Sequence, residues 1–111
     1  MSPLTLYKAL SEETRLKSLL MMQQLGEICV CDLMQALELS QPKVSRHLAE
    51  LRKHAIVLDE RRGKWVHYRI NPNLPEWVKD ILQITLKNNA SLIDKELSSI
   101  CKGQCNSDAK L

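Results

Sequence analysis

The chain has 111 residues, of which 44% are hydrophobic and 26% charged, and its formal net charge is +3. This composition is typical of one folded domain and excludes a disordered chain. It contains no apolar run near the roughly 20 residues that cross a membrane. No basic segment followed by an apolar one begins the chain, so we expect a cytoplasmic location, where thiols stay reduced.

Positive charge is concentrated in the middle of the chain. Residues 41 to 69 hold eight of the 16 lysines and arginines, only three of the 13 acidic residues, and all three histidines. A surface that faces nucleic-acid phosphates requires such a concentration. A basic face exposed only to water gives the same count, so charge alone leaves both interpretations open.

Hydrophobic spacing predicts helices through the first half of the chain. A short helix is expected over residues 4 to 10, and a second with Ser11 as its N-cap and Gly26 at its end. Another short helix, from about Val30 to Leu37, precedes a helix over residues 41 to 54. The buried stripe of this last helix is predicted to comprise Val44, Leu48, Leu51 and Ala55. Two short helices joined by a tight turn form a helix-turn-helix.

The hydrophobic period changes after residue 56. Residues 57 to 61 and 65 to 70 are rich in β-branched and aromatic side chains and are expected to be strands. Arg62, Gly63 and Lys64 would join them, with Gly63 at a position of positive φ. A basic hairpin after a helix-turn-helix is a wing. The predicted fold class is therefore mainly α with one β-hairpin, a winged helix-turn-helix.

A long helix is expected from about Pro75 to Ile100. Its apolar stripe is broad for the last helix of so small a chain, which favours packing against a second copy over packing within the chain. We therefore expect a dimer formed through the terminal helices, with contacts from Leu4, Leu6, Val78, Leu82 and Leu86. Residues 1–100 would form the DNA-binding and dimerisation domain, and residues 101–111 a flexible tail.

Two cysteines, Cys29 and Cys31, lie just ahead of the helix-turn-helix. Considered alone, such a pair is either a set of soft metal ligands or two small buried hydrophobic residues. The stretch Glu27-Ile28-Cys29-Val30-Cys31-Asp32-Leu33 resembles the metal-binding box of the ArsR/SmtB family of bacterial repressors. Residues 40–48 and 63–69 resemble the recognition helix and wing of its arsenic-responsive branch.

This resemblance extends over about residues 4 to 85 and implies a function. It implies a homodimeric repressor that binds a palindromic DNA operator of a metalloid-resistance operon. An enzyme is not expected, because the sequence shows no Ser-His-Asp order, Gly-rich phosphate loop or paired carboxylate cleft. Trivalent arsenic, or antimony, would bind Cys29 and Cys31 and release the dimer from DNA. It implies no constitutive cofactor.

The geometry of the cysteine pair restricts how it binds an ion. On a regular helix, residues two apart point roughly 200° away from each other. The sulfurs therefore converge only if Cys29 lies outside the helix or the first turn is distorted. The positive end of the helix is expected to lower the thiol pKa.

Met34 departs from the pattern of the resembling proteins, which often have a third cysteine at that position. A thioether is a weak ligand, and packing in the core is the favoured role for Met34. Either the pair suffices with a non-protein ligand or an organic trivalent arsenical, or Cys101 or Cys105 supplies the third thiolate.

Two other sensor types on the same fold are weighed against this interpretation. A thiol redox sensor would form a disulfide within the pair or between Cys101 and Cys105, but one residue between Cys29 and Cys31 makes an internal bond strained. Cadmium and lead sensors of the family add cysteines from the N-terminal arm, and none precedes Cys29. Zinc sensors place Asp and His ligands on the C-terminal helix, and no histidine follows His67.

The N-terminal part of a recognition helix reaches base edges. Arginine suits guanine and glutamine suits adenine, whereas cations of a wing contact phosphates. Trp65 and Tyr68 are expected to be packing residues of the hairpin. The predicted DNA-binding residues are Gln41, Lys43, Ser45, Arg46, His47, Arg62 and Lys64.

Overall fold

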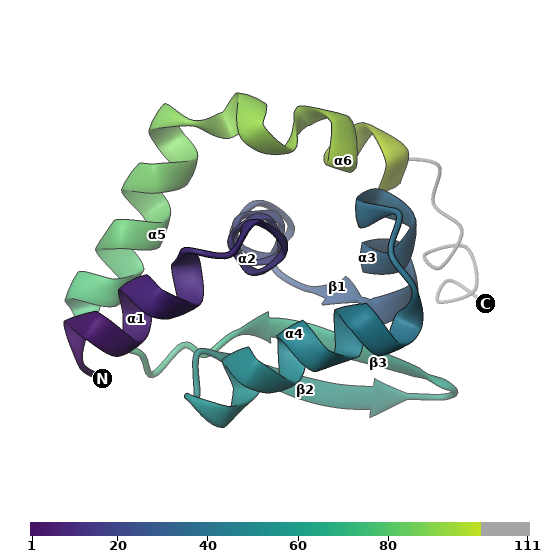
Figure 1. Cartoon of the computed structure of the whole chain (residues 1–111), viewed down its shortest axis with the longest axis horizontal. Coiled ribbons are helices and arrows are strands. Elements are labelled where there is room, and N and C mark those ends of the chain that lie inside the picture. The colour runs from purple at the N-terminus through teal and green to yellow at the C-terminus, as the bar shows by residue number, and fades with distance from the viewer. Residues whose placement is uncertain (101–111) are drawn as a thin grey trace.

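The computed structural model describes residues 1–100, which fold as helices around one small sheet (Figure 1). Two further features of the sequence, the predicted tail and its two cysteines, lie outside the described residues. The helices are α1 (Pro3–Leu10), α2 (Glu13–Leu25), α3 (Val30–Leu37), α4 (Gln41–Lys53), α5 (Glu76–Asn88), the 3-10 helix η1 (Ala90–Ile93) and α6 (Asp94–Ile100). The strands are β1 (Ile28–Cys29), β2 (Val57–Arg62) and β3 (Trp65–Ile70).

The start of α2 differs from the prediction by one residue. Ser11 has helical backbone angles (φ −78°, ψ −3°), and its hydroxyl donates to the Lys8 carbonyl at 2.8 Å, so it closes α1. Glu12 is extended (φ −105°, ψ 131°) and its carboxylate accepts from the Arg15 backbone N–H at 3.0 Å. An N-cap needs an extended backbone, so Glu12 caps α2 and the assignment to Ser11 is wrong. Gly26, with φ 90°, ends α2 as predicted.

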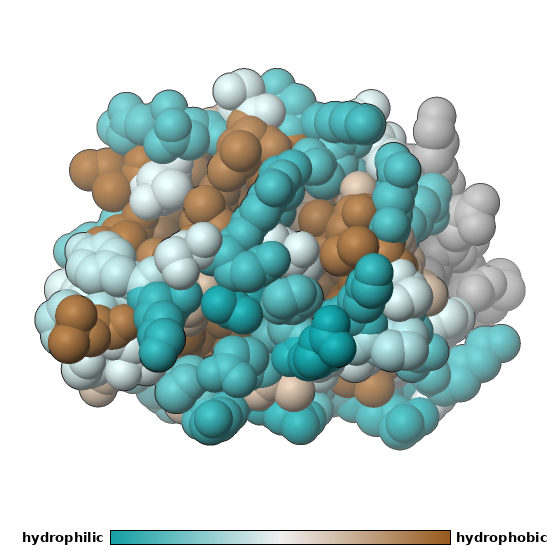
Figure 2. Space-filling view, viewed as in Figure 1, coloured by the Kyte–Doolittle hydropathy of each residue, from teal (hydrophilic) through white to brown (hydrophobic). Residues whose placement is uncertain are grey.

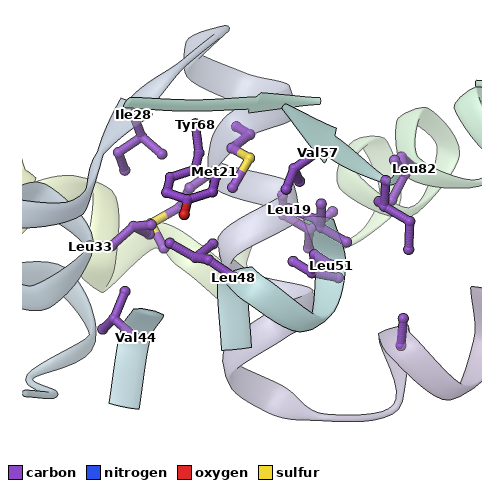
Figure 3. Close-up of a cluster of buried hydrophobic side chains, with 14 of the residues drawn as sticks. Leu19, Met21, Ile28, Leu33, Val44, Leu48, Leu51, Val57, Tyr68 and Leu82 are labelled. Carbon is purple, nitrogen blue, oxygen red and sulfur yellow. The ribbon is translucent and has the colours of Figure 1, made fainter. Parts of the chain in front are cut away.

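The helix-turn-helix formed by α3 and α4 is confirmed. Val44, Leu48 and Leu51 of α4 are buried. Figure 3 shows Leu48 pointing toward Leu33 of α3 and Tyr68 of β3, so α4 is packed against both the preceding helix and the sheet. Ala55 does not continue this stripe. It lies beyond the end of α4, is exposed, and has a φ of 60° that takes the chain out of the helix.

The predicted hairpin is present, and a third strand that the sequence did not reveal is added to it. β2 and β3 pair antiparallel from Val57–Ile70 to Arg62–Trp65, and Gly63 in the turn has a φ of 62°. The short strand β1 pairs with the other side of β3, with Cys29 opposite His67. A strand of two residues is too short to show an alternating pattern, but it joins the wing directly to the cysteine pair.

The predicted long terminal helix is interrupted at Asn89. The side chain of Asn88 donates to the Ile84 carbonyl at 2.8 Å, and that of Asn89 donates to the Thr85 carbonyl at 3.0 Å. Asn89 leaves the helical region, with φ −140° and ψ 35°. Asparagine favours such local bonds over helix continuation. The chain therefore turns, and α6 runs across the top of Figure 1 to pack against α3.

The broad apolar stripe of the last helices is mostly used within the chain. Val78 and Leu82 of α5 and Leu6 of α1 have no exposed surface, because α2 and the rest of the core cover them. A side chain without exposed surface cannot contact a second copy, so the structure corrects the interface assignment for these three residues. Leu86 is half-buried, and Leu4 is 82% exposed.

A partly buried ion pair fastens α6 to α2. Lys17 donates to the Glu96 carboxylate at 2.8 Å, with side-chain exposures of only 16% and 10%. The hydrogen bond to Glu96 raises the pKa of Lys17. Burial pushes the pKa of Glu96 upward, but the bonds from Lys17 and the backbone outweigh it, and the net shift is downward.

We expect Glu96→Gln to destabilise the fold by about 2 kcal/mol at neutral pH, because it leaves the partly buried Lys17 ammonium with only its exposed partner, Glu13. The pKa of Glu96 is lowered by folding, so its contribution is present above the ordinary value of 4.5 and is lost as the pH falls through the folded pKa. The raised pKa of Lys17 makes the pair fail again only in alkali, above 10.5. Urea unfolding of the wild type and of Glu96→Gln across this pH range measures the difference in their free energies of unfolding.

Glu13→Gln is the matched control for this experiment. Glu13 also pairs with Lys17, at 2.9 Å, but its side chain is 75% exposed. Exposed pairs contribute little, so a loss below about 0.5 kcal/mol is expected. Equal losses in the two variants would contradict the role assigned to Glu96.

Candidate metalloid site and DNA-reading surface

Cys29 and Cys31 converge because only one of them is inside a helix. Cys29 ends β1 with an extended backbone (φ −88°, ψ 158°) and occupies the N-cap of α3, where its Sγ accepts from the Asp32 N–H at 3.4 Å. Cys31 is the second residue of α3. The two Sγ atoms lie 2.6 Å apart. Of the two arrangements that the sequence allowed, the structure has Cys29 outside the helix.

The environment of the pair is more apolar than the sequence predicted. Cys29 is a free thiol with 2% of its surface exposed, and Cys31 is half-buried. Burial raises the pKa of Cys29 to about 11, although the backbone N–H of Asp32 acts in the opposite direction. The expected lowering of the pKa by the helix end is therefore wrong for Cys29, because loss of hydration outweighs the backbone hydrogen bonds that act in the opposite direction.

A carboxylate completes a cluster of three donors. The ligand atoms of Cys29, Cys31 and Asp32 all lie within 4.8 Å of one another, and Asp32 is 3% exposed. Asp32 was not among the residues predicted from the sequence to bind an ion. Its position three residues after an N-cap was a usable signal, since side chains there turn back toward the cap. Met34 is half-buried against the core, which agrees with a packing role.

A cavity of about 490 Å³ opens beside Cys29. Apolar residues of α2 and α6 form one part of its wall, and polar residues near the wing form the other. Its lining includes Leu25, Glu27, Arg62, His67, Leu97 and Ile100. The chain therefore leaves α6, at Ile100, next to the cysteine pair.

The predicted DNA-reading residues of α4 fall into two groups. Gln41, Lys43 and Arg46 are exposed. Ser45 and His47 are half-buried. The His47 Nδ1 lies 3.4 Å from Arg15 Nη1 and 3.7 Å from the Glu12 carboxylate, so this ring faces α2 rather than solvent.

The two predicted cations of the wing also differ. Lys64, in the turn, is exposed. Arg62 is tied to two carboxylates: it donates to Glu60 at 2.8 Å and, through both terminal nitrogens, to Glu27. Tyr68 is buried and Trp65 half-buried, in keeping with the packing roles expected of them.

Within residues 1–100, none of the helices combines the length and the apolar character that crossing a membrane requires.

Comparison with known proteins agrees with the fold. The family model described as "bacterial regulatory protein, arsR family" matches residues 12–57, which run from the cap of α2 to the start of the wing. The chain is also similar to a solved structure described as the AntR antimony-specific transcriptional repressor. The two share 31% identity and a TM-score of 0.65, over 79% of this chain and 77% of that one.

Two curated relatives are more similar in sequence. The arsenic resistance transcriptional regulator ArsR2 of Pseudomonas putida is 54% identical over 80% of this chain and 77% of its own length. The arsenical resistance operon repressor of Escherichia coli is 43% identical over 97% of this chain and 92% of its own length. The chain therefore belongs to the arsR family of bacterial regulatory proteins, which are DNA-binding transcriptional regulators and not enzymes.

Proposed function

We propose that the chain is a homodimeric repressor that binds a palindromic operator in the cytoplasm and leaves it when trivalent arsenic or antimony binds Cys29 and Cys31. The observation that carries the proposal is the 2.6 Å approach of the two sulfurs at the start of α3, the helix that precedes the DNA-reading helix. Names of the relatives support the effector class, since two regulate arsenic resistance and one is antimony-specific.

The chemistry suits a protonated, buried thiol. Trivalent arsenic is soft and prefers sulfur ligands. When arsenous acid reacts with two thiols, two As–S bonds form, and two hydroxyl groups leave as water with the thiol protons. No thiolate has to exist beforehand, so the raised pKa of Cys29 is compatible with binding. The third valence is filled by a remaining hydroxyl, by the organic group of an arsenical, or by Cys101 or Cys105.

The test uses operator DNA selected by the protein from a random duplex pool. Fluorescence anisotropy then measures its dissociation constant with and without arsenite, and with peroxide as the redox control. Release by arsenite supports the proposal, whereas release by peroxide alone would support a redox sensor instead. X-ray absorption of the arsenite-loaded protein, compared with a Cys101→Ser, Cys105→Ser variant, counts the sulfur ligands and shows whether the tail contributes one.

For DNA reading, we expect Arg46→Ala to weaken operator binding by about 1–3 kcal/mol per half-site, because a bidentate contact to guanine is lost. Binding to random duplex should change much less. Arg52→Ala is the matched control, since Arg52 lies on the same helix but pairs with Asp59 at 2.9 Å. Similar losses on operator and random DNA would show that Arg46 contacts phosphates only.

For the dimer, the exposed apolar residues of α1 and α5 provide the proposed interface. These are Leu4, Tyr7, Trp77 and Ile84. Figure 2 shows hydrophobic side chains at the end of the molecule where Figure 1 places these helices. We expect Ile84→Glu to give a monomer in sedimentation velocity, because it would bury a charge. Leu25→Glu, at a residue 47% exposed elsewhere, should leave the dimer intact.

A further inference from the structure

The wing and the cysteine segment are joined by a side-chain link as well as by strand pairing. Glu27 stands immediately before β1 and two residues before Cys29. Its Oε1 accepts from Arg62 Nη2 at 3.0 Å, and its Oε2 accepts from Arg62 Nη1. The His67 Nδ1 lies 3.6 Å from the same Oε2. One carboxylate is therefore in contact with residues of both wing strands.

The position of Arg62 means that this link can pass movement from Glu27 to the tip of the wing. Arg62 is the last residue of β2, and the tip of the wing follows it. Two parallel N–H···O bonds fix the orientation of a guanidinium against a carboxylate as well as their separation. A displacement of Glu27 therefore also moves the end of β2 and the exposed Lys64 that follows it.

The other end of the link leads to the sulfur atoms. Cys29 belongs to β1 and, through its Sγ, caps α3 by accepting from the Asp32 N–H. A metalloid on that sulfur would compete with this N–H for sulfur electron density. Loss of the cap would allow the two-residue strand to shift, together with Glu27 on the same short segment.

Building on the proposed function, we propose that Glu27 is the positioning residue that transmits metalloid binding at Cys29 and Cys31 to the wing through its paired bonds with Arg62. The wing is then withdrawn from its DNA-bound position when the site is filled. Glu27 contacts neither the metalloid nor the DNA in this scheme. It acts only by connecting two segments that are 35 residues apart in sequence.

Glu27→Gln tests the proposal, with Glu60→Gln as its matched control. Glu60 pairs with the same arginine at 2.8 Å, but it lies on the same strand as Arg62, and that strand does not pair with β1. The quantity measured is the ratio of operator dissociation constants with and without arsenite. Couplings between sites are typically about 5- to 150-fold, so the ratio should fall by about fivefold or more in Glu27→Gln and stay at the wild-type value in Glu60→Gln.

A second measurement separates transmission from a structural role. Arsenite affinity of each variant is followed by intrinsic tryptophan fluorescence, and amide hydrogen exchange is measured over residues 62–66. In the wild type, and in Glu60→Gln, arsenite should change wing exchange. In Glu27→Gln it should bind equally well and leave wing exchange unchanged.

Three results would overturn the inference. A wild-type ratio in Glu27→Gln would show that release does not pass through this carboxylate. Equal falls in both variants would show that only the charge balance around Arg62 matters. A wild-type protein that arsenite does not release would remove the proposed function, and this inference with it, which distinguishes the two failures.

Discussion

Cys31→Ser should bind operator DNA as the wild type does and should no longer be released by arsenite. Serine offers a hard oxygen where the soft ion needs sulfur, so the cluster keeps a single thiol. Moving a two-state equilibrium from 1:99 to 99:1 requires about 5.5 kcal/mol of differential binding. We expect the arsenite concentration for half-release to rise at least about 100-fold, which corresponds to ~2.7 kcal/mol. Anisotropy titration of an operator duplex measures both properties.

Met34→Leu is the control for this substitution. It removes the other sulfur of α3 while keeping the volume of a half-buried packing residue, so release should be unchanged. If Cys31→Ser were released at the wild-type arsenite concentration, the assigned site would be wrong. If Met34→Leu lost release as well, the thioether would belong to the ligand set.

Leu48→Ala should destabilise the fold by about 3 kcal/mol, because a large core side chain leaves a cavity that its neighbours fill only in part. Leu48 is 1% exposed and packs between α3 and the sheet, beside Leu33 and Tyr68 (Figure 3). Small domains have only about 5–15 kcal/mol of total stability, so this loss is large. Urea unfolding followed by circular dichroism measures it in the absence of DNA and arsenite.

Lys43→Ala supplies the reference for the stability experiment. It changes an exposed residue of the same helix, and its effect should stay within about 0.5 kcal/mol. A loss below about 1 kcal/mol for Leu48→Ala would mean that α4 is not held by this contact. The helix would then be held mainly by its other buried residues, Val44 and Leu51.

The elements that position the site could be predicted because their signals are local. Secondary structure could be predicted directly from the periodic apolar residues of α3 and α4 and from the strand residues around Gly63. The cysteine spacing also showed that the two sulfurs converge only with Cys29 outside the helix or a distorted first turn, and the structure has the first of these. The structure agrees on each of these points.

The features that escaped prediction depend on contacts between distant residues. Val78 and Leu82 looked like partner contacts because the packing of α2 against α5, which covers them, has no local sequence signal. Cys29 lies opposite His67 because β1 pairs with β3, and a strand of two residues is too short for its sequence to predict that pairing. The raised pKa of Cys29 follows from the same burial, since neighbours in space outweigh the end of its own helix.

Cys29 serves as the end of a strand, the cap of a helix and a sulfur donor at once. These roles can be lost separately, because serine is among the best N-cap residues whereas leucine caps poorly. A bacterial lineage with Cys29→Ser would keep α3 folded and would still bind DNA, but it would lose the response to metalloid. Its target genes would then stay silenced permanently. A change to leucine at the same position would damage repression as well. Substitutions that inactivate such a sensor but preserve the cap of α3 are therefore expected to leave its target genes permanently silenced.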